Sequence, residues 1–430
     1  EILAYISSEV FDTYSYVKIY PKVIYYLYLS TPERDRDWNR LLCLSNRGIE
    51  QLRTTGRMYY LWELIEIRRE GLIWLLDTIE NDGEGRKREA VQKVIDMMTD
   101  WLEALDFVHE LCGTHRRMET SCYLYQQKEA YCISDVIRRR REMLGMTKKA
   151  LCEGICSEKT IGRLEAKKTK PQIEIVRLLF ERLNLSGEYQ RWQVVTKDVR
   201  AYPIVGEIVR YVNNCDAEKT KILLEDLEQY VSMKNPINKQ YRERIELYVS
   251  LRQGKIAREE AVEKFIQTLE YTIPYKNVTV NGEKYLTNVE IQCLLDIAVN
   301  MVKTCMNNAL DSLIDICRQL ENDDGISEHI AVWEIVMTNV ANIYGNIGEF
   351  DKSDMINLRI LRECIYCYRM SMLELNLYII TWNCSERKKN NIPIKQGYQE
   401  ELYLKRCITL CQINKNIARE LRIKERLKKL

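Results

Sequence analysis

The chain has 430 residues and a formal net charge of +2, because 65 Lys and Arg nearly balance 63 Asp and Glu. Apolar residues make up 46% and charged residues 30%, which is typical of a folded globular protein and excludes a highly charged disordered chain. Only 7 Pro and 17 Gly favour long helices, and the lack of a secretory signal or an apolar run of ~20 residues predicts a cytoplasmic protein outside the membrane.

The first 130 residues form a Tyr-rich region with the pattern of helical hairpins. Candidate helices lie near 35–55, 57–80 and 86–111, separated by Gly-containing turns. Because the sequence begins with Glu1, we expect it to start inside a longer chain or after processing.

A short motif of this region recurs far along the chain. Arg57-Met58 with Leu61 returns as Arg369-Met370 with Leu373, in each case after an apolar helix. The recurrence indicates either that residues 1–80 are the tail of an earlier repeat array or that the match is accidental.

Four residues, His109, Cys112, His115 and Cys122, raise the question of a metal site. His109 and Cys112 would share one helix face, but Gly113 would end that helix and no second cysteine pair completes a zinc pattern. We therefore expect no metal and no other cofactor. The fifteen cysteines lie mostly among apolar neighbours and are expected to be reduced core residues.

The stretch from Ile133 to Leu185 predicts four short helices with identifiable ends. Ser134 or Asp135 can cap the first helix, which runs to Leu144 and stops at Gly145. Thr147 caps a second helix (148–153) that ends at Gly154, Ser157 caps a third (158–166), and a fourth (172–183) follows Pro171. Their apolar residues fall at spacings that can form one small core.

This stretch is also the basic part of the chain. Residues 133–191 contain 14 Lys and Arg against 8 Asp and Glu, a balance of +6. Lys159, Thr160 and Arg163 would share an exposed face of the third helix, where such side chains can contact base edges in a major groove. Lys148 would face a phosphate at the start of the second helix.

These residues resemble the Cro/lambda-repressor-like (Xre-type) helix-turn-helix family. The family pattern is met by Arg141, Gly145, Met146, Thr147, Leu151, Ser157, Thr160, Ile161, Leu164 and Glu165. The resemblance implies an ion pair between Arg141 and Glu165 and base readers at Lys159 and Arg163. The expected DNA-contacting set is Lys148, Ser157, Lys159, Thr160 and Arg163. The chain departs from the family at Arg140, usually apolar, at Lys167, often Gly, and at Lys148, commonly Gln.

From about residue 205 onward the chain reads as successive amphipathic helix pairs. In the clearest pair, a helix with small Ala341 and bulky Tyr344 is followed by a turn at Gly348 and by Phe350 and Ser353. This arrangement predicts tetratricopeptide-like packing, with Ser353 in place of the usual Ala.

The sequence therefore predicts an all-α protein in three parts: a helical, possibly repeat-like region (1–130), a helix-turn-helix domain (131–191) and a tetratricopeptide-like α-solenoid (205–430). The combination resembles peptide-sensing bacterial transcription regulators of the Rgg/PlcR type, although that family begins with its DNA-binding module. The resemblance implies double-stranded DNA, a peptide or small effector and a second copy of the chain as partners. Asn339 and Asn342 are the candidate effector contacts.

Two other functions stay open. The helix-turn-helix could dock a protein, which would make the chain an interaction scaffold. An enzyme is the weaker alternative, because the sequence has three histidines, no phosphate-binding glycine loop and no nucleophile elbow.

Overall fold

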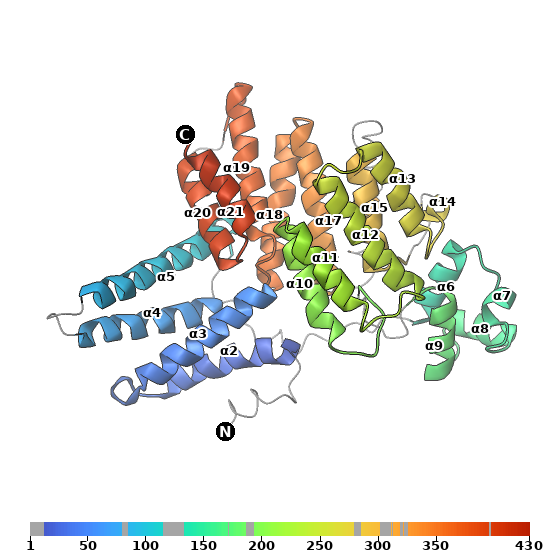
Figure 1. Ribbon diagram of the computed structural model, residues 1–430, viewed down its shortest axis with the longest axis horizontal. Helices are drawn as coiled ribbons and strands as arrows, with labels where there is room; N and C mark the ends of the chain where they lie inside the picture. Colours follow the sequence, from blue (N-terminus) through green and yellow to red (C-terminus); the bar gives the residue numbers. More distant parts are fainter. Residues whose placement is uncertain are drawn as a thin grey trace. The chain divides into compact units, whose positions relative to one another are not determined.

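A computed structural model describes residues 13–79, 85–114, 133–170, 172–185, 193–278, 285–301, 311, 313–318, 321, 326–394 and 397–430. The predicted all-α class is confirmed, since the described residues form helices joined by turns (Figure 1). The only extended pairing in these ranges is an isolated antiparallel bridge between Arg57 and Arg369.

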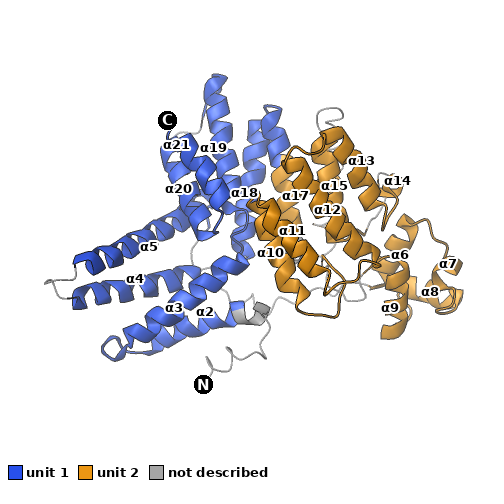
Figure 2. Cartoon of the chain, viewed as in Figure 1, with its two compact units in different colours: residues 1–122, 341–430 blue, residues 123–340 orange. Residues whose placement is uncertain are grey.

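The chain divides into two compact units (Figure 2). One unit consists of residues 1–122 and 341–430, and the other of residues 123–340. The division at residues 130, 191 and 205 that the sequence suggests stays a prediction. Pro171, His115 and Cys122 lie outside the described residues.

The first unit contains two series of packed helices. The first series is α2 (Thr13–Ser30), the 3-10 helix Glu33–Asp35, α3 (Trp38–Thr55), α4 (Leu61–Thr78) and α5 (Gly85–Cys112). The second series is α18 (Phe350–Tyr366), α19 (Leu373–Lys389), α20 (Glu400–Ile413) and α21 (Ile417–Leu427). Each helix from α3 to α5 and from α18 to α21 packs on its neighbour in sequence, and α5 also packs on α18 and α20.

Local sequence explains the ends and the close packing of α3. Asp37 caps the helix by accepting a hydrogen bond from the Arg40 backbone N–H, and Gly56 ends it in the left-handed region at φ 64°. A Cβ atom at Gly71 of α4 would lie 3.0 Å from Leu42, so glycine allows α3 and α4 to approach closely.

The second unit begins with four short helices, α6 (Ile133–Met143), α7 (Lys148–Cys152), α8 (Glu158–Glu165) and α9 (Ile173–Arg182). It continues with α10 (Ala201–Asn213), α11 (Ala217–Leu227), α12 (Pro236–Arg252), α13 (Arg258–Leu269), α14 (Tyr275–Val278) and α15 (Asn288–Met301). Helices α10 and α11 pack together, as do α12 and α13, so the predicted succession of helix pairs is present here.

The helix pair that the sequence marks most clearly consists of the C-terminal part of α17 (Ile326–Asn346) and the start of α18. Gly348 makes the turn at φ 85°. Ser353 is fully buried, and its hydroxyl accepts a 2.8 Å hydrogen bond from the amide of Asn383 on α19. The hydroxyl that replaces the usual Ala methyl group thus has a polar partner. Tetratricopeptide geometry itself stays a prediction.

Candidate nucleic-acid interface

Helices α6 to α9 surround one apolar core. Its buried members are Val136, Ile137, Leu151, Cys152, Ile161, Leu164, Val176, Leu179, Phe180, Leu183 and Leu185. Gly145 and Gly154 take the predicted left-handed turns at φ 65° and 71°. Helix α6 already begins at Ile133, so Ser134 and Asp135 lie in its first turn instead of capping it, which corrects the expected start.

Side-chain caps fix the two helices of the helix-turn-helix. Thr147 accepts a 3.1 Å hydrogen bond from the Ala150 backbone N–H at the start of α7. Ser157 accepts a 3.1 Å bond from the Thr160 backbone N–H at the start of α8, and the two hydroxyls lie 2.8 Å apart. Each cap typically contributes ~1 kcal/mol, so both helices have defined first turns.

The exposed face of α8 carries the predicted base readers. Lys159 and Arg163 are exposed, and Thr160 is half-buried. Because Lys159 and Arg163 are four residues apart, they lie on the same side of the helix. The opposite side contributes Ile161 and Leu164 to the core. Helix α8 therefore packs its apolar side on the core and directs two cationic side chains toward solvent.

Behind this face, Arg141 and Glu165 join α6 to α8. Arg141 Nε donates a 2.6 Å hydrogen bond to one Glu165 oxygen, and Nη2 lies 3.2 Å from the other. The hydrogen bond that Arg141 donates to Glu165 holds the pKa of Arg141 above its usual value. Lys148 Nζ lies 3.4 Å from the same carboxylate, so the first residue of α7 also contacts the end of α8.

Sequence reasoning missed two arginines that hold the module. Arg182 of α9 donates to the carbonyls of Leu151 and Glu153, and so satisfies the open C-terminal end of α7. Arg140 was identified only as a departure from the family pattern. It is fully buried and forms a two-bond ion pair with Glu290 of α15, at 2.8 Å and 2.6 Å.

The Arg140–Glu290 pair is the centre of a polar contact between the four-helix module and the helices that follow it. Arg140 Nε also donates to the Leu183 carbonyl at 3.0 Å. Glu290 accepts a bond from the Thr272 hydroxyl at 2.5 Å and one from the Thr287 backbone N–H at 2.8 Å. The pair therefore has the additional hydrogen bonds that a buried charge requires.

The two candidate effector residues both lie on helix α17. Asn339 is half-buried, and its amide donates a 2.8 Å bond to the Ile335 carbonyl one turn earlier in its own helix. Asn342 is also half-buried. Neither residue is among those that line the hollow described next.

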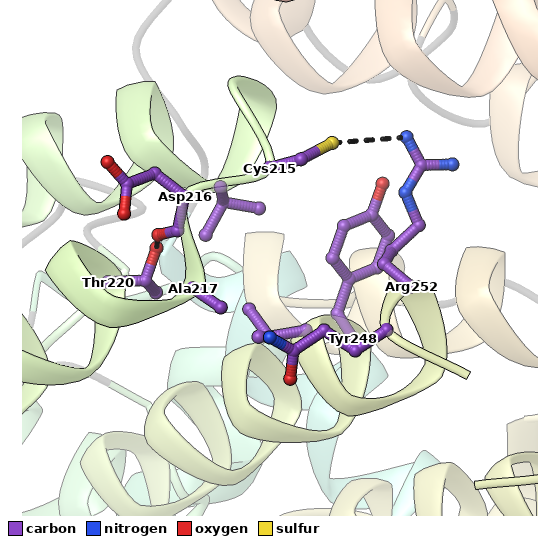
Figure 3. Close-up of a pocket in the computed structure, with 9 residues that line it drawn as sticks. Cys215, Asp216, Ala217, Thr220, Tyr248 and Arg252 are labelled. Carbon is purple, nitrogen blue, oxygen red and sulfur yellow. Dashed lines mark hydrogen bonds between the residues drawn. The ribbon is translucent and has the colours of Figure 1, made fainter. Parts of the chain in front are cut away.

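A hollow of about 330 Å³, including its open part, lies where the turn between α10 and α11 meets α12 (Figure 3). It is lined by Val212, Cys215, Asp216, Ala217, Thr220, Tyr248, Val249, Arg252 and Gln253. Arg252 Nη2 lies 3.9 Å from the Cys215 sulfur at its rim. Part of this volume is open solvent, so the enclosed space is too small for a typical small-molecule site.

Two of the residues considered for metal binding, His109 and Cys112, are buried among packed helices. His109 packs edge-on against the Trp62 ring, and its Nδ1 lies 3.0 Å from the Thr114 hydroxyl. Among the residues that the structure describes, no three His, Cys, Asp or Glu side chains gather as a metal site would require. Within the same ranges, no helix combines the length and apolar character needed to span a bilayer.

A family model and several solved structures are similar to the chain. No curated protein matches the chain. Solved structures resemble it at low identity. PlcR from Bacillus thuringiensis, in complex with the peptide PapR7 and DNA, is 15% identical, with 68% of this chain and 99% of that chain covered and a TM-score of 0.43. ComR from S. thermophilus, with DNA and its signalling peptide ComS, is 13% identical (69% and 98% covered, TM-score 0.41). The Streptococcus dysgalactiae pheromone receptor Rgg2 is 14% identical (69% and 99% covered, TM-score 0.33). Residues 137–190 match the helix-turn-helix family model, so the predicted family is confirmed for this part of the chain.

Proposed function

We propose that the chain is a sequence-specific DNA-binding transcriptional regulator of the cytoplasm. The observation that carries the proposal is the capped helix α8, which presents Lys159 and Arg163 to solvent from a helix-turn-helix core. In this motif the second helix enters the major groove, where Lys and Arg donate hydrogen bonds to guanine O6 and N7.

The remaining contacts divide by role. Lys148 stands at the N-terminus of α7, where its charge and the helix amides together attract a phosphate. Ser157 and Thr160 hold the first turn of α8, and Thr160 can contact a thymine methyl group. Phosphate contacts set the register and affinity, whereas base contacts set the sequence preference.

The second part of the proposal is control by a peptide or small effector bound to the helix pairs after residue 205. It is supported by the successive pairs α10/α11 and α12/α13, because stacked helix pairs form an extended groove. Peptides are also the partners of PlcR and ComR in the structures named above. Asn339 and Asn342 stay candidates for contacts with this effector.

DNA selection with the purified full chain tests the function directly. The chain should enrich a defined sequence from random duplex DNA, and affinity should fall steeply with salt because phosphate contacts release counterions. Lys159→Ala and Arg163→Ala should each cost ~1–3 kcal/mol on the selected site and relax one base position, whereas Lys148→Ala should weaken all sequences alike.

The matched control is Lys221→Ala, which removes the same charge from an exposed site on α11. It should leave binding unchanged. A chain that shows no enrichment and little salt dependence docks a protein through its helix-turn-helix instead. Equal losses on selected and random DNA for Lys159→Ala and Arg163→Ala would remove these residues as base readers.

A further inference from the structure

The two helical series of the first unit follow the same plan at a constant distance in sequence. Helix α3 begins at Trp38 and α18 at Phe350; α4 begins at Leu61 and α19 at Leu373. Both differences, 350 − 38 and 373 − 61, equal 312. The recurring motif around Arg57 and Arg369 has the same spacing. The distance from the start of the first helix to the start of the next is therefore 23 residues in both series.

Burial follows the same offset. All five buried positions of α3 and all seven of α4 become buried positions of α18 and α19 when 312 is added to their numbers. The rule holds even where the side chains differ, as for Leu52 and Cys364. It continues into α5 and α20, where Ile95, Met98 and Trp101 correspond to the buried Cys407, Leu410 and Ile413. Shared helical periodicity alone would not preserve the phase across two loops.

The two copies meet at equivalent residues. Arg57 and Arg369, which differ by 312, form the isolated antiparallel bridge. The Met58 N–H donates to the Tyr368 carbonyl at 2.9 Å, and the Met370 N–H donates to the Gly56 carbonyl at 3.0 Å. Replacing each residue by its equivalent in the other series, 312 positions away, converts one bond into the other. Such reciprocal contacts between equivalent residues define a two-fold, isologous interface, which is normally formed by two protein copies.

The contacts around this bridge favour pairing of α18–α20 with α3–α5 of the same chain, the internal copy, over pairing with α18–α20 of a second chain. Tyr59 stacks on Tyr368 with ring centroids 5.0 Å apart, whereas the residue equivalent to Tyr59 is Ser371. Arg53 donates to the carbonyls that end α20, whereas its equivalent, Ile365, has no side-chain donor.

The charges at this contact also favour the internal copy over a second chain. Lys415 Nζ lies 2.8 Å from Glu50 of the internal copy. The residue equivalent to Glu50 is Arg362, so a second chain docked in the same way would bring Arg362 toward Lys415. Like charges at an interface exclude a partner as effectively as good contacts select one.

We propose that helices α3–α5 occupy the position that a second copy of α18–α20 would take. The surface of α18–α20 through which two chains would associate is therefore already covered within a single chain. The expected homodimer then cannot form through α18–α20 while the internal copy is in place. If two chains cooperate on DNA, they pair through another surface.

Cysteine cross-linking in the full-length chain tests the proposal. The bridge at residues 57 and 369 is a non-hydrogen-bonded antiparallel pair, whose Cα atoms lie ~4.5 Å apart, within the range of a disulfide. Arg57→Cys with Arg369→Cys should therefore form an intrachain disulfide on mild oxidation. Arg57→Cys with Ser371→Cys is the register control, which should not, because diagonal neighbours lie ~7–8 Å apart. The parent chain sets the background from native cysteines.

The single variant Arg369→Cys gives the decisive result. Residue 369 lies at the two-fold axis, so a second chain docked on this face would place two copies of the new thiol side by side. We expect no cross-linked dimer above the parent background. A cross-linked dimer of the single variant, or interchain products from the double variant, would overturn the proposal.

A charge variant tests the preference separately. Glu50→Arg should slow the intrachain disulfide about twofold to fivefold, since an exposed ion pair contributes ~0.2–1 kcal/mol and repulsion replaces it. Adding Lys415→Glu should restore the rate. An unchanged rate in Glu50→Arg, with helical content equal to the parent by circular dichroism, would exclude charge as the basis of the preference.

Discussion

The buried pair of Arg140 and Glu290 leads to the most specific prediction about stability. Both side chains have no exposed surface, and two hydrogen bonds join them. Removing one partner of such a pair leaves an unpaired buried charge, which typically costs ~3–5 kcal/mol. The two possible removals should not be equal, because an isolated carboxyl can be neutralised by a proton, whereas a guanidinium stays charged.

Glu290→Leu should therefore be the more damaging change. It leaves the Arg140 cation with backbone carbonyls as its remaining partners, at 3.0 Å from Leu183 and 3.5 Å from Thr272. Arg140→Leu leaves Glu290 with the Thr272 hydroxyl and the Thr287 N–H, and its cost should shrink as pH falls. The double variant should cost far less than the sum, because apolar residues of similar size often replace a buried pair without loss.

Urea unfolding of the four proteins, followed by circular dichroism at pH 5 and pH 8, measures these differences. We expect ~4 kcal/mol for Glu290→Leu, less for Arg140→Leu, and a coupling free energy of ~2–3 kcal/mol. Losses that add within 0.5 kcal/mol, which is roughly the scatter of independent sites, would refute the argument. So would a larger loss for Arg140→Leu than for Glu290→Leu at both pH values.

Three further predictions concern other contacts. Glu165→Gln should destabilise the helix-turn-helix by ~1–3 kcal/mol in thermal unfolding, and combining it with Arg141→Gln should add little; strict additivity would mean that the pair is not coupled. Burial raises the pKa of Glu400, but hydrogen bonds from a serine and an arginine lower it more, so the net pKa is below 4.5. Its contribution to stability is complete above that value and lost as pH falls, so Glu400→Gln should flatten the acid side of the stability profile, and an unchanged profile would count against this pair. Burial raises the pKa of the Cys407 thiol, so iodoacetamide should label exposed Cys43 first; equal labelling in the folded chain would contradict the burial.

The parts of the module that depend on local sequence could be predicted to within a residue or two. Thr147 and Ser157 cap α7 and α8 as expected, because a cap requires only a side-chain oxygen three residues before its donor. The start of α6 is the exception. A cap at Ser134 or Asp135 placed the first helical residue two or three positions after Ile133, where the helix begins, because Ser and Asp can also occupy a first turn. Helix ends without a single dominant cap are the least determined by sequence.

Contacts between distant residues could not be predicted. The run from Arg138 to Arg141 looks uniform in sequence, yet its members differ in the structure. Arg138 lies near the carboxylates of Asp135 and Glu142 on its own helix, Arg140 is buried against Glu290, and Arg141 bonds to Glu165. Glu290 lies 150 residues after Arg140, so no local pattern marks it as the partner. The resemblance to a family supplied only the Arg141 contact, because the Arg140 contact departs from the family pattern.

The position of Arg140 has a consequence for control of the helix-turn-helix. Arg140 is on α6, one residue before the arginine that fixes α8 through Glu165, whereas Glu290 is on α15 among the later helices. A ligand that moves α15 must therefore either carry α6 with it or break two buried hydrogen bonds. Because breaking them costs more than the 1–3 kcal/mol of a typical allosteric coupling, movement of the two helices together is the less costly response. A bound effector could then change the position of α8 without any change in the core that supports it.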